Sequence, residues 1–139
     1  MLTIILMNDL NGNLVIRLLL DTQILIWLPA ADKRLKVHVR DVILDETTEL
    51  FVSAITAWEY TDLRKRKRVA APETIAELQL GLGFTLLDLP AKIWSDIDGL
   101  PVIHRDPVDR MLICHARHAD IILATADKAI RQYPIKTLW

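Results

Sequence analysis

Short apolar runs alternate with stretches of helical spacing along this chain. The runs predict strands over residues 15–20, 50–53, 84–87, 121–124 and 135–138. Between them, an apolar residue recurs every three or four positions, which predicts helices over 22–28, 35–45, 54–67, 72–81, 90–98, 107–119 and 127–131. Strands that alternate with helices favour a parallel sheet covered by helices, so the expected fold class is α/β.

Length and composition then limit the kind of protein. The 139 residues suit one domain, and 52% hydrophobic with 25% charged residues allow a sizeable core. The formal net charge is -1, so a polyanion would have to be held by a local basic patch or by a metal. The single cysteine, Cys114, excludes an intrachain disulfide. Its apolar neighbours in a predicted helix indicate a core residue, and a reducing compartment fits.

The first 13 residues are expected to form an N-terminal extension that precedes a domain of residues 14–139. The apolar segment 2–7 is too short to span a membrane. It has no basic residue before it and no small-residue cleavage site after it, so it does not resemble a signal peptide. Residues 8–13, NDLNGN, indicate a polar turn. We therefore expect a cytoplasmic protein without membrane association.

Four acidic residues follow predicted strands or lie on the next helices: Asp21, Glu59, Asp109 and Asp127. Each alone has a simple structural explanation, as a helix cap or as part of a solvated helix face. Strands joined by right-handed crossovers run in one direction, however, so these acids would meet at one edge of the sheet. Converging carboxylates need a cation to stay ionised, and oxygen ligands select Mg²⁺ or Mn²⁺ over zinc. Thr125 could donate a hydrogen bond to a neighbouring carboxylate or to a metal-bound water.

The segment HRDPVDR, residues 104–110, begins a helix. Asp106 is the expected N-cap, whereas Asp109 shares the face that packs on the sheet and so points over the sheet edge. The histidines are spread along the sequence and form no competing ligand cluster: His38, His104, His115 and His118. His115 and His118 lie three residues apart on one helix and are interpreted as a solvated pair.

Basic residues are concentrated in one run: Arg64, Lys65, Arg66, Lys67 and Arg68. The simpler interpretation is a solvated helix end that the helix dipole favours, and the functional one is a ridge that binds RNA phosphates. Arg105 and Arg110 flank the acids and could contact phosphate or neutralise the carboxylates. Trp27, Trp58 and Trp94 are expected in the core, although an exposed apolar groove would suit a partner helix or a second subunit.

With these motifs in this order, the chain resembles a PIN-domain ribonuclease, specifically the VapC-type toxin of a VapBC toxin–antitoxin pair. The resemblance covers residues 14–139 and rests on LLLDTQILIWL (18–28), VSAITAWEY (52–60), HRDPVDRMLICHA (104–116) and LATADKAI (123–130). It implies a three-layer α/β/α sandwich around a central, mostly parallel sheet of about five strands. It also implies a four-acid site at Asp21, Glu59, Asp109 and Asp127, with Thr125 as the polar residue of the last motif.

The same resemblance implies an activity and partners. Such proteins are Mg²⁺- or Mn²⁺-dependent endoribonucleases that cut RNA, often structured RNA such as tRNA. They usually form homodimers, and a cognate antitoxin blocks the acidic pocket. This chain departs from the pattern at Gln23, where close relatives commonly carry His, and in its N-terminal extension.

The expected mechanism uses Asp21 and Asp109 as the principal metal ligands, with Glu59 and Asp127 completing the shell, partly through water. The metal would lower the pKa of a bound water that attacks the scissile phosphate, with one or two metals taking part. A phosphatase that forms an aspartyl phosphate is disfavoured, because Gln23 stands where such a site needs a second acid. The alternative from another class is a non-catalytic RNA-binding or regulatory module that uses the run of residues 64–68.

Overall fold

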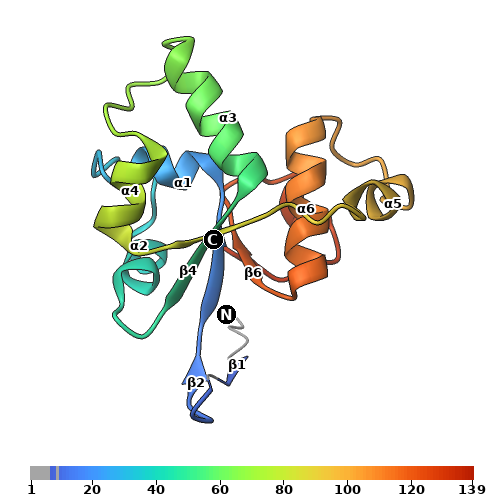
Figure 1. Cartoon of the computed structure of the whole chain (residues 1–139), viewed down its shortest axis with the longest axis horizontal. Helices are drawn as coiled ribbons and strands as arrows, with labels where there is room; N and C mark the ends of the chain where they lie inside the picture. The colour runs from blue at the N-terminus through green and yellow to red at the C-terminus, as the bar shows by residue number, and fades with distance from the viewer. Residues whose placement is uncertain (1–6, 9) are drawn as a thin grey trace.

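A five-stranded parallel sheet forms the centre of the protein (Figure 1). The computed structural model describes residues 7–8 and 10–139. In spatial order the strands are β5 (Thr85–Leu87), β4 (Glu49–Ser53), β3 (Arg17–Leu20), β6 (Ile122–Ala124) and β7 (Thr137–Leu138). Every neighbouring pair in this sheet is parallel. The α/β class and the parallel sheet predicted from the sequence are confirmed.

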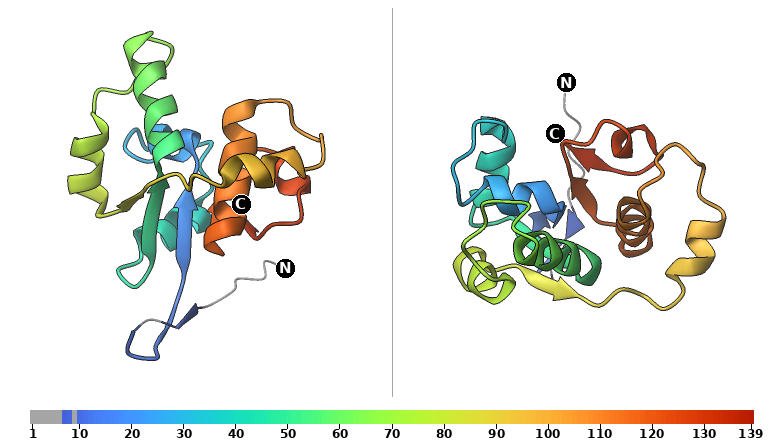
Figure 2. Two further views of the ribbon diagram at one scale, coloured as in Figure 1. Left: turned by 45° about the vertical axis from the view of Figure 1, so that its right-hand side comes forward. Right: turned by 90° about the horizontal axis from the view of Figure 1, so that it is seen from above.

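Helices cover both faces of the sheet, which gives three layers (Figure 2). They are α1 (Thr22–Trp27), α2 (Val37–Leu44), α3 (Ala54–Lys65), α4 (Ile75–Leu82), α5 (Ile93–Asp98) and α6 (Pro107–Ala119). Leu18 and Leu20 of β3 join a cluster with residues of α1, α2 and α4, whereas Leu19 joins a second cluster with α5 and α6. All three leucines are fully buried, as expected for the middle strand of a sheet with a core on each face.

The N-terminal residues form a small hairpin in the part that the structure describes. β1 (Met7–Asn8) pairs antiparallel with β2 (Leu14–Val15). The predicted strand 15–20 is therefore interrupted at Ile16, and only residues 17–20 join the parallel sheet. The predicted polar turn 8–13 is shorter than expected because Asn8 belongs to β1; the turn after it includes Gly12 at φ 81°, a conformation that glycine adopts without strain. Residues 2–6 of the predicted apolar segment lie outside the described residues.

The boundary of α4 differs from the prediction for a local reason. The helix begins at Ile75 and not at Pro72, because Thr74 caps it. Thr74 Oγ1 accepts a hydrogen bond from the backbone N–H of Glu77 at 3.2 Å. The Glu77 side chain accepts one from the Thr74 N–H, also at 3.2 Å. This reciprocal capping box outweighs the preference of Pro72 for the first helical turn.

Two other helices are shorter than predicted. α5 begins at Ile93, three residues after the predicted start at Pro90. The predicted helix 127–131 is reduced to the 3-10 turn η1 (Ile130–Gln132). Of the helices in the described ranges 7–8 and 10–139, none is long and apolar enough to cross a membrane.

The parallel register brings the carboxyl ends of the central strands to one edge. Leu20, the last residue of β3, lies beside Ala124, the last residue of β6. β3 is flanked by β4 on one side and by β6 on the other, so the chain leaves the sheet in opposite directions around this point. Ligands of open α/β sheets bind at such a switch in strand order.

Candidate functional site

One pocket lies at the carboxyl end of the sheet and contains all four predicted acids. The cavity has a volume of about 390 Å³ and is lined by Asp21, Gln23, Glu59, Leu63, Asp106, Asp109, Ala126 and Asp127. Asp21 directly follows β3, and Asp127 follows β6. Glu59 comes from α3, and Asp109 from the first turn of α6. The structure therefore brings together acids that are up to 106 positions apart in the sequence, from residue 21 to residue 127.

Asp21 is the most buried of these acids. It caps α1: Oδ1 accepts a hydrogen bond from Thr22 N at 2.7 Å, and Oδ2 accepts one from the Thr125 hydroxyl at 2.6 Å. Burial nevertheless raises the pKa of Asp21 from 3.8 to about 6, with the charges of Glu59 and Asp127 adding to the effect. A cation close to Asp21 would lower this pKa again, because it would favour the ionised carboxylate.

Asp109 has the most strongly raised pKa of the described acids. Its side chain is 17% exposed, and burial raises the pKa from 3.8 to about 7. The neighbouring charges of Asp21 and Asp106 raise it further, while nearby His104 opposes the shift. Asp106 itself is the predicted N-cap, and its Oδ1 accepts from Val108 N and Asp109 N at 2.9 and 3.2 Å.

Asp127 behaves differently because its carboxylate is well supplied with donors. Burial by itself would raise the pKa, but hydrogen bonds from Ile130 N, His104 and Ala129 N outweigh it, and the pKa lies below the ordinary value. The two backbone bonds both reach Oδ1, at 2.8 Å from Ala129 N and 3.0 Å from Ile130 N. Oδ2 is left to face the pocket.

Glu59 faces the same pocket from α3 and is half-buried. Its charge contributes to the raised pKa values of Asp21 and Asp109, which requires it to lie near both. Within residues 7–8 and 10–139 the Glu59 carboxylate has no hydrogen bond or ion pair. Among these residues, no arginine therefore pairs with Glu59.

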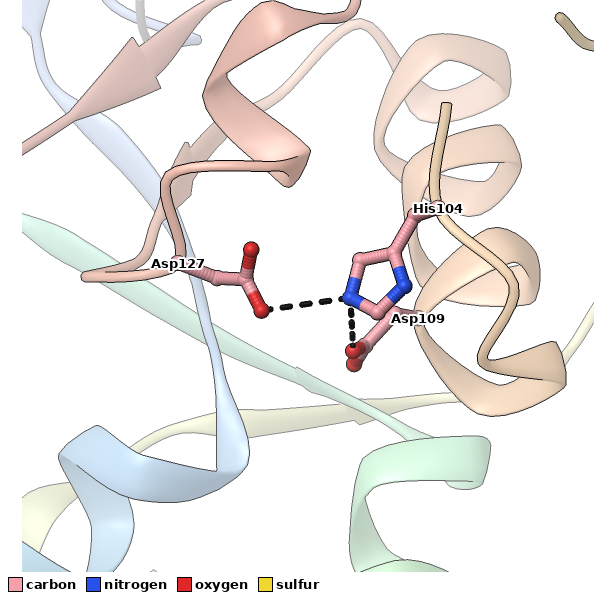
Figure 3. A group of neighbouring side chains, drawn as sticks. All are labelled: His104, Asp109 and Asp127. Atoms are coloured by element: carbon pink, nitrogen blue, oxygen red, sulfur yellow. Dashed lines mark hydrogen bonds and ion pairs between the residues drawn. The ribbon is translucent and has the colours of Figure 1, made fainter. Parts of the chain in front are cut away.

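His104 lies beside the pocket lining, in contact with two of its acids, and the sequence interpretation missed this position. Figure 3 shows its ring between two of the acids: Nε2 lies 2.8 Å from Asp109 Oδ2 and 3.2 Å from Asp127 Oδ2. His104, Asp109 and Asp127 offer ligand atoms that all lie within 4.8 Å of one another. The sequence feature that could have indicated His104 is its position two residues before the Asp106 N-cap, because a residue there lies beside the first turn of the helix.

A clamp holds the loop that carries His104. The hydroxyl of Tyr133 accepts hydrogen bonds from Ile103 N at 3.1 Å and His104 N at 2.8 Å, and it donates to the carbonyl of Pro101 at 2.8 Å. Arg110 donates to three carbonyls of the same loop, those of residues 100, 101 and 104, and to the carbonyl of Ile97 in the last turn of α5. The Arg110 guanidinium is thus occupied by these carbonyls, and Arg110 is not included in the proposed RNA-binding surface.

The basic run divides into bound and free side chains. Arg64 donates to the carbonyls of Ala71 and Pro72 at 3.1 and 3.2 Å, and Arg66 pairs with Asp62 at 3.2 Å. The remaining three are exposed and have no side-chain partner among the described residues: Lys65, Lys67 and Arg68. Arg105 is likewise exposed beside the pocket.

Two minor predictions are wrong. His115 and His118 are not a solvated pair: His115 is buried, with Nδ1 2.8 Å from the Ser53 hydroxyl, because its side of α6 packs toward α3. Burial, followed by the charge of His118, lowers the pKa of His115. Trp58 and Trp94 are 57% and 71% exposed and do not belong to the core.

Trp27 and Cys114 lie where the sequence predicted, in or against the core. Trp27 is partly buried against the core and packs on Trp139, with ring centroids 6.1 Å apart. Cys114 is buried and free, as its apolar neighbours predicted.

The donor set of the pocket fits a hard divalent cation. Four carboxylates line it, and two of them have pKa values raised by burial and by mutual repulsion. A cation in the pocket would remove that repulsion, and carboxylate oxygens are the ligands that Mg²⁺ and Mn²⁺ prefer.

Comparison with known proteins gives the family. The PIN domain family matches residues 18–136, and the chain belongs to it. No curated protein gives a sequence match.

Solved structures agree on the fold. VapBC2 from Rickettsia felis, bound to a DNA fragment from its promoter, has a TM-score of 0.62 at 14% identity, over 88% of this chain and 98% of that one. DNA-bound VapBC from Salmonella typhimurium has a TM-score of 0.61 at 20% identity, over 88% and 97%. PAE2754 from Pyrobaculum aerophilum has a TM-score of 0.58 at 19% sequence identity, over 88% of this chain and 83% of that one. At these identities the likeness shows a shared fold.

Proposed function

We propose that this protein is a Mg²⁺- or Mn²⁺-dependent endoribonuclease and the toxin of a VapBC-type toxin–antitoxin pair, acting in the cytoplasm. The observation that carries the proposal is the convergence of Asp21, Glu59, Asp109 and Asp127 on one pocket of about 390 Å³. Membership of the PIN domain family and the likeness to VapBC structures support the same conclusion.

The residues of the pocket divide the work. Asp21, Asp109, Glu59 and Asp127 would hold the metal, which supplies positive charge that lowers the pKa of water and offsets charge on a phosphate. Thr125 keeps Asp21 oriented through its 2.6 Å hydrogen bond. The backbone amides after Asp127 keep that carboxylate turned so that Oδ2 faces the pocket. Fixed carboxylates reduce the reorganisation needed when metal and phosphate enter.

RNA is the proposed substrate, and exposed cations at the end of α3 and next to Asp106 would hold its backbone. Lys65, Lys67, Arg68 and Arg105 are exposed, and the first three follow or end α3, the helix that also carries Glu59. A structured RNA such as tRNA is the substrate class that the family resemblance suggests. We also propose a homodimer and a cognate antitoxin, supported by the VapBC complexes among the structural neighbours and by the exposed Trp58 and Trp94.

The alternative is a non-catalytic RNA-binding module that uses Arg64–Arg68. Of its five side chains, Arg64 donates to backbone carbonyls and Arg66 forms a surface ion pair with Asp62, which leaves three without a partner for phosphate. A module of this kind also does not use the convergence of four carboxylates on one pocket. We therefore rank it second.

One experiment separates the two functions. The purified protein is incubated with total cellular RNA in Mg²⁺, in Mn²⁺ and in EDTA, and new RNA ends are sequenced. The nuclease predicts discrete ends that need a divalent ion and disappear in Asp109→Asn. Glu46→Gln is the matched control, because Glu46 is exposed and precedes the start of β4, at the end of the parallel strands opposite to the pocket. RNA that binds equally in EDTA and stays uncut would favour the module.

A further inference from the structure

We propose that the His104 ring occupies the metal position when no metal is bound. A divalent ion displaces the ring and is not coordinated by it. The inference rests on the proposed metal site. It starts from the position of Nε2, 2.8 Å from Asp109 Oδ2 and 3.2 Å from Asp127 Oδ2 (Figure 3). A single N–H there is shared by two carboxylates that would otherwise repel each other.

His104 contacts carboxylate oxygens that a shared cation could use. Asp127 Oδ1 already accepts from two backbone amides, so Oδ2 is the oxygen left for a cation. Asp109 also presents Oδ2 to the ring. An ion held through both Oδ2 atoms therefore competes with the imidazole.

The other ring nitrogen decides whether the imidazole can stay as a ligand. Nδ1 accepts a hydrogen bond from the backbone N–H of Asp106 at 3.2 Å. An accepting Nδ1 leaves the ring proton on Nε2, so Nε2 is a donor and has no lone pair for a metal. Histidines that bind metals usually donate from the second nitrogen to a carbonyl or carboxylate, whereas here that nitrogen faces a donor. The local hydrogen bonds thus favour a ring that donates over a ring that coordinates.

The surroundings allow the ring to leave while its backbone stays in place. Tyr133 and Arg110 hold the main chain at His104 by hydrogen bonds to its N–H and carbonyl. The side chain itself is 19% exposed, so rotation about its own bonds can move the ring into solvent. In the metal-free protein, His104 would thus hold the carboxylates of Asp109 and Asp127 close together by hydrogen bonds until a metal binds.

Direct binding measurements on the full chain test this proposal. Mg²⁺ and Mn²⁺ are titrated by calorimetry at pH 7.5 into metal-free wild type, His104→Ala and His104→Gln, with circular dichroism to confirm folding. Removing the competing hydrogen bonds should make His104→Ala bind both ions about fivefold more tightly. His104→Gln keeps an amide N–H donor and should stay within about twofold of the wild type. Asp109→Asn should lose binding, which identifies the titrated site.

Weaker Mn²⁺ binding by His104→Ala would show that the ring is a ligand and would overturn the proposal, as would unchanged affinity for both ions. Absence of binding in the wild type is a different result: it removes the metal from the proposed function itself.

A second measurement needs no variant. Nitrogen NMR of the wild-type ring should show the proton on Nε2 both before and after saturation with Mg²⁺. Loss of that proton on Mg²⁺ binding contradicts displacement.

Discussion

The hydroxyl of Thr125 donates a 2.6 Å hydrogen bond to Oδ2 of Asp21, which lies 104 positions earlier in the chain. The same hydroxyl oxygen accepts from Asp127 N at 3.1 Å. One buried side chain therefore fixes a carboxylate after β3 and the backbone of the loop after β6. Both strands end in the acidic pocket, so this contact joins its two sides.

Thr125→Val should damage both stability and activity. Valine has the same shape but neither donates to Asp21 nor accepts from Asp127, and a buried group without its partner costs about 1–3 kcal/mol of unfolding free energy. Losing the donor also raises the pKa of Asp21 above about 6, so less of it is ionised near neutral pH. Urea unfolding and RNA cleavage measure the two effects. Thr125→Ser keeps the hydroxyl and is the control; equal stability of the valine variant and the wild type would refute this role.

Asp109→Asn should stabilise the metal-free protein while it abolishes cleavage. Burial and the charges of Asp21 and Asp106 raise the pKa of Asp109 to about 7, so its ionised form is unfavourable in the folded state at pH 8. The neutral amide removes that cost, and we expect a gain of about 1–2 kcal/mol in EDTA. The measurement is chemical unfolding in millimolar EDTA, with Glu46→Gln as the control variant. A loss of stability would mean that the carboxylate is not repelled as described.

The stability of the metal-free protein should depend on pH in a defined direction. The folded-state pKa values of Asp21 and Asp109 rise from 3.8 to about 6 and about 7. Their contribution is therefore fully present below pH 3.8 and is lost as the pH rises through 6 and 7. Buried His115, whose pKa is lowered, acts in the opposite direction.

The difference between wild type and Asp109→Asn isolates the carboxylate from His115. The stabilising effect of the substitution should grow between pH 5 and 8 and should disappear when Mg²⁺ is added to the wild type. Thermal unfolding across this range, with EDTA or Mg²⁺, makes the comparison. A difference that is constant with pH contradicts the raised pKa of Asp109.

The three side chains of the basic run that have no partner among the described residues should contribute to RNA binding through charge. Replacing Lys65, Lys67 and Arg68 together with alanine should make the dependence of log affinity on log salt shallower by about 2, if three phosphate contacts are lost from a single strand. Arg64→Ala is the contrast, because Arg64 holds the carbonyls of Ala71 and Pro72 and should mainly change stability. Binding of a catalytically inactive variant at several salt concentrations gives the slopes. An unchanged slope in the triple variant would exclude this surface.

Tyr133→Phe should release the loop that carries His104. It removes the hydroxyl that accepts from Ile103 N and His104 N and keeps the buried ring. Hydrogen exchange at these two amides should become at least about tenfold faster, corresponding to about 1.4 kcal/mol or more. Amides in β3 serve as internal references. Equal protection in both proteins would show that Arg110 alone holds the loop.

The central part of the fold could be predicted from local patterns. The apolar run 15–20, interrupted only by Arg17 and followed by Asp21, predicted a buried strand, and parallel crossovers then implied that the acids converge. The N-cap role of Asp106 was equally local, because it depends on residues two and three positions ahead. These predictions needed no knowledge of distant contacts.

His104 and the helix boundaries were missed because distant or competing contacts decide them. His104 reaches Asp127 only because Tyr133 and Arg110 fold residues 97–104 back over the start of α6. No spacing in the sequence reveals that clamp. His115 was misjudged for the same reason, since its partner Ser53 is 62 positions away.

The order of the strands also matters while the protein is being synthesised. The half of the sheet made of β3, β4 and β5 leaves the ribosome first, and it carries Asp21 and Glu59 but neither Asp109 nor Asp127. β6 then has to dock on the other side of β3 before the remaining acids join them. A chain that has not yet formed α6 and β6 therefore has only half of the acidic pocket.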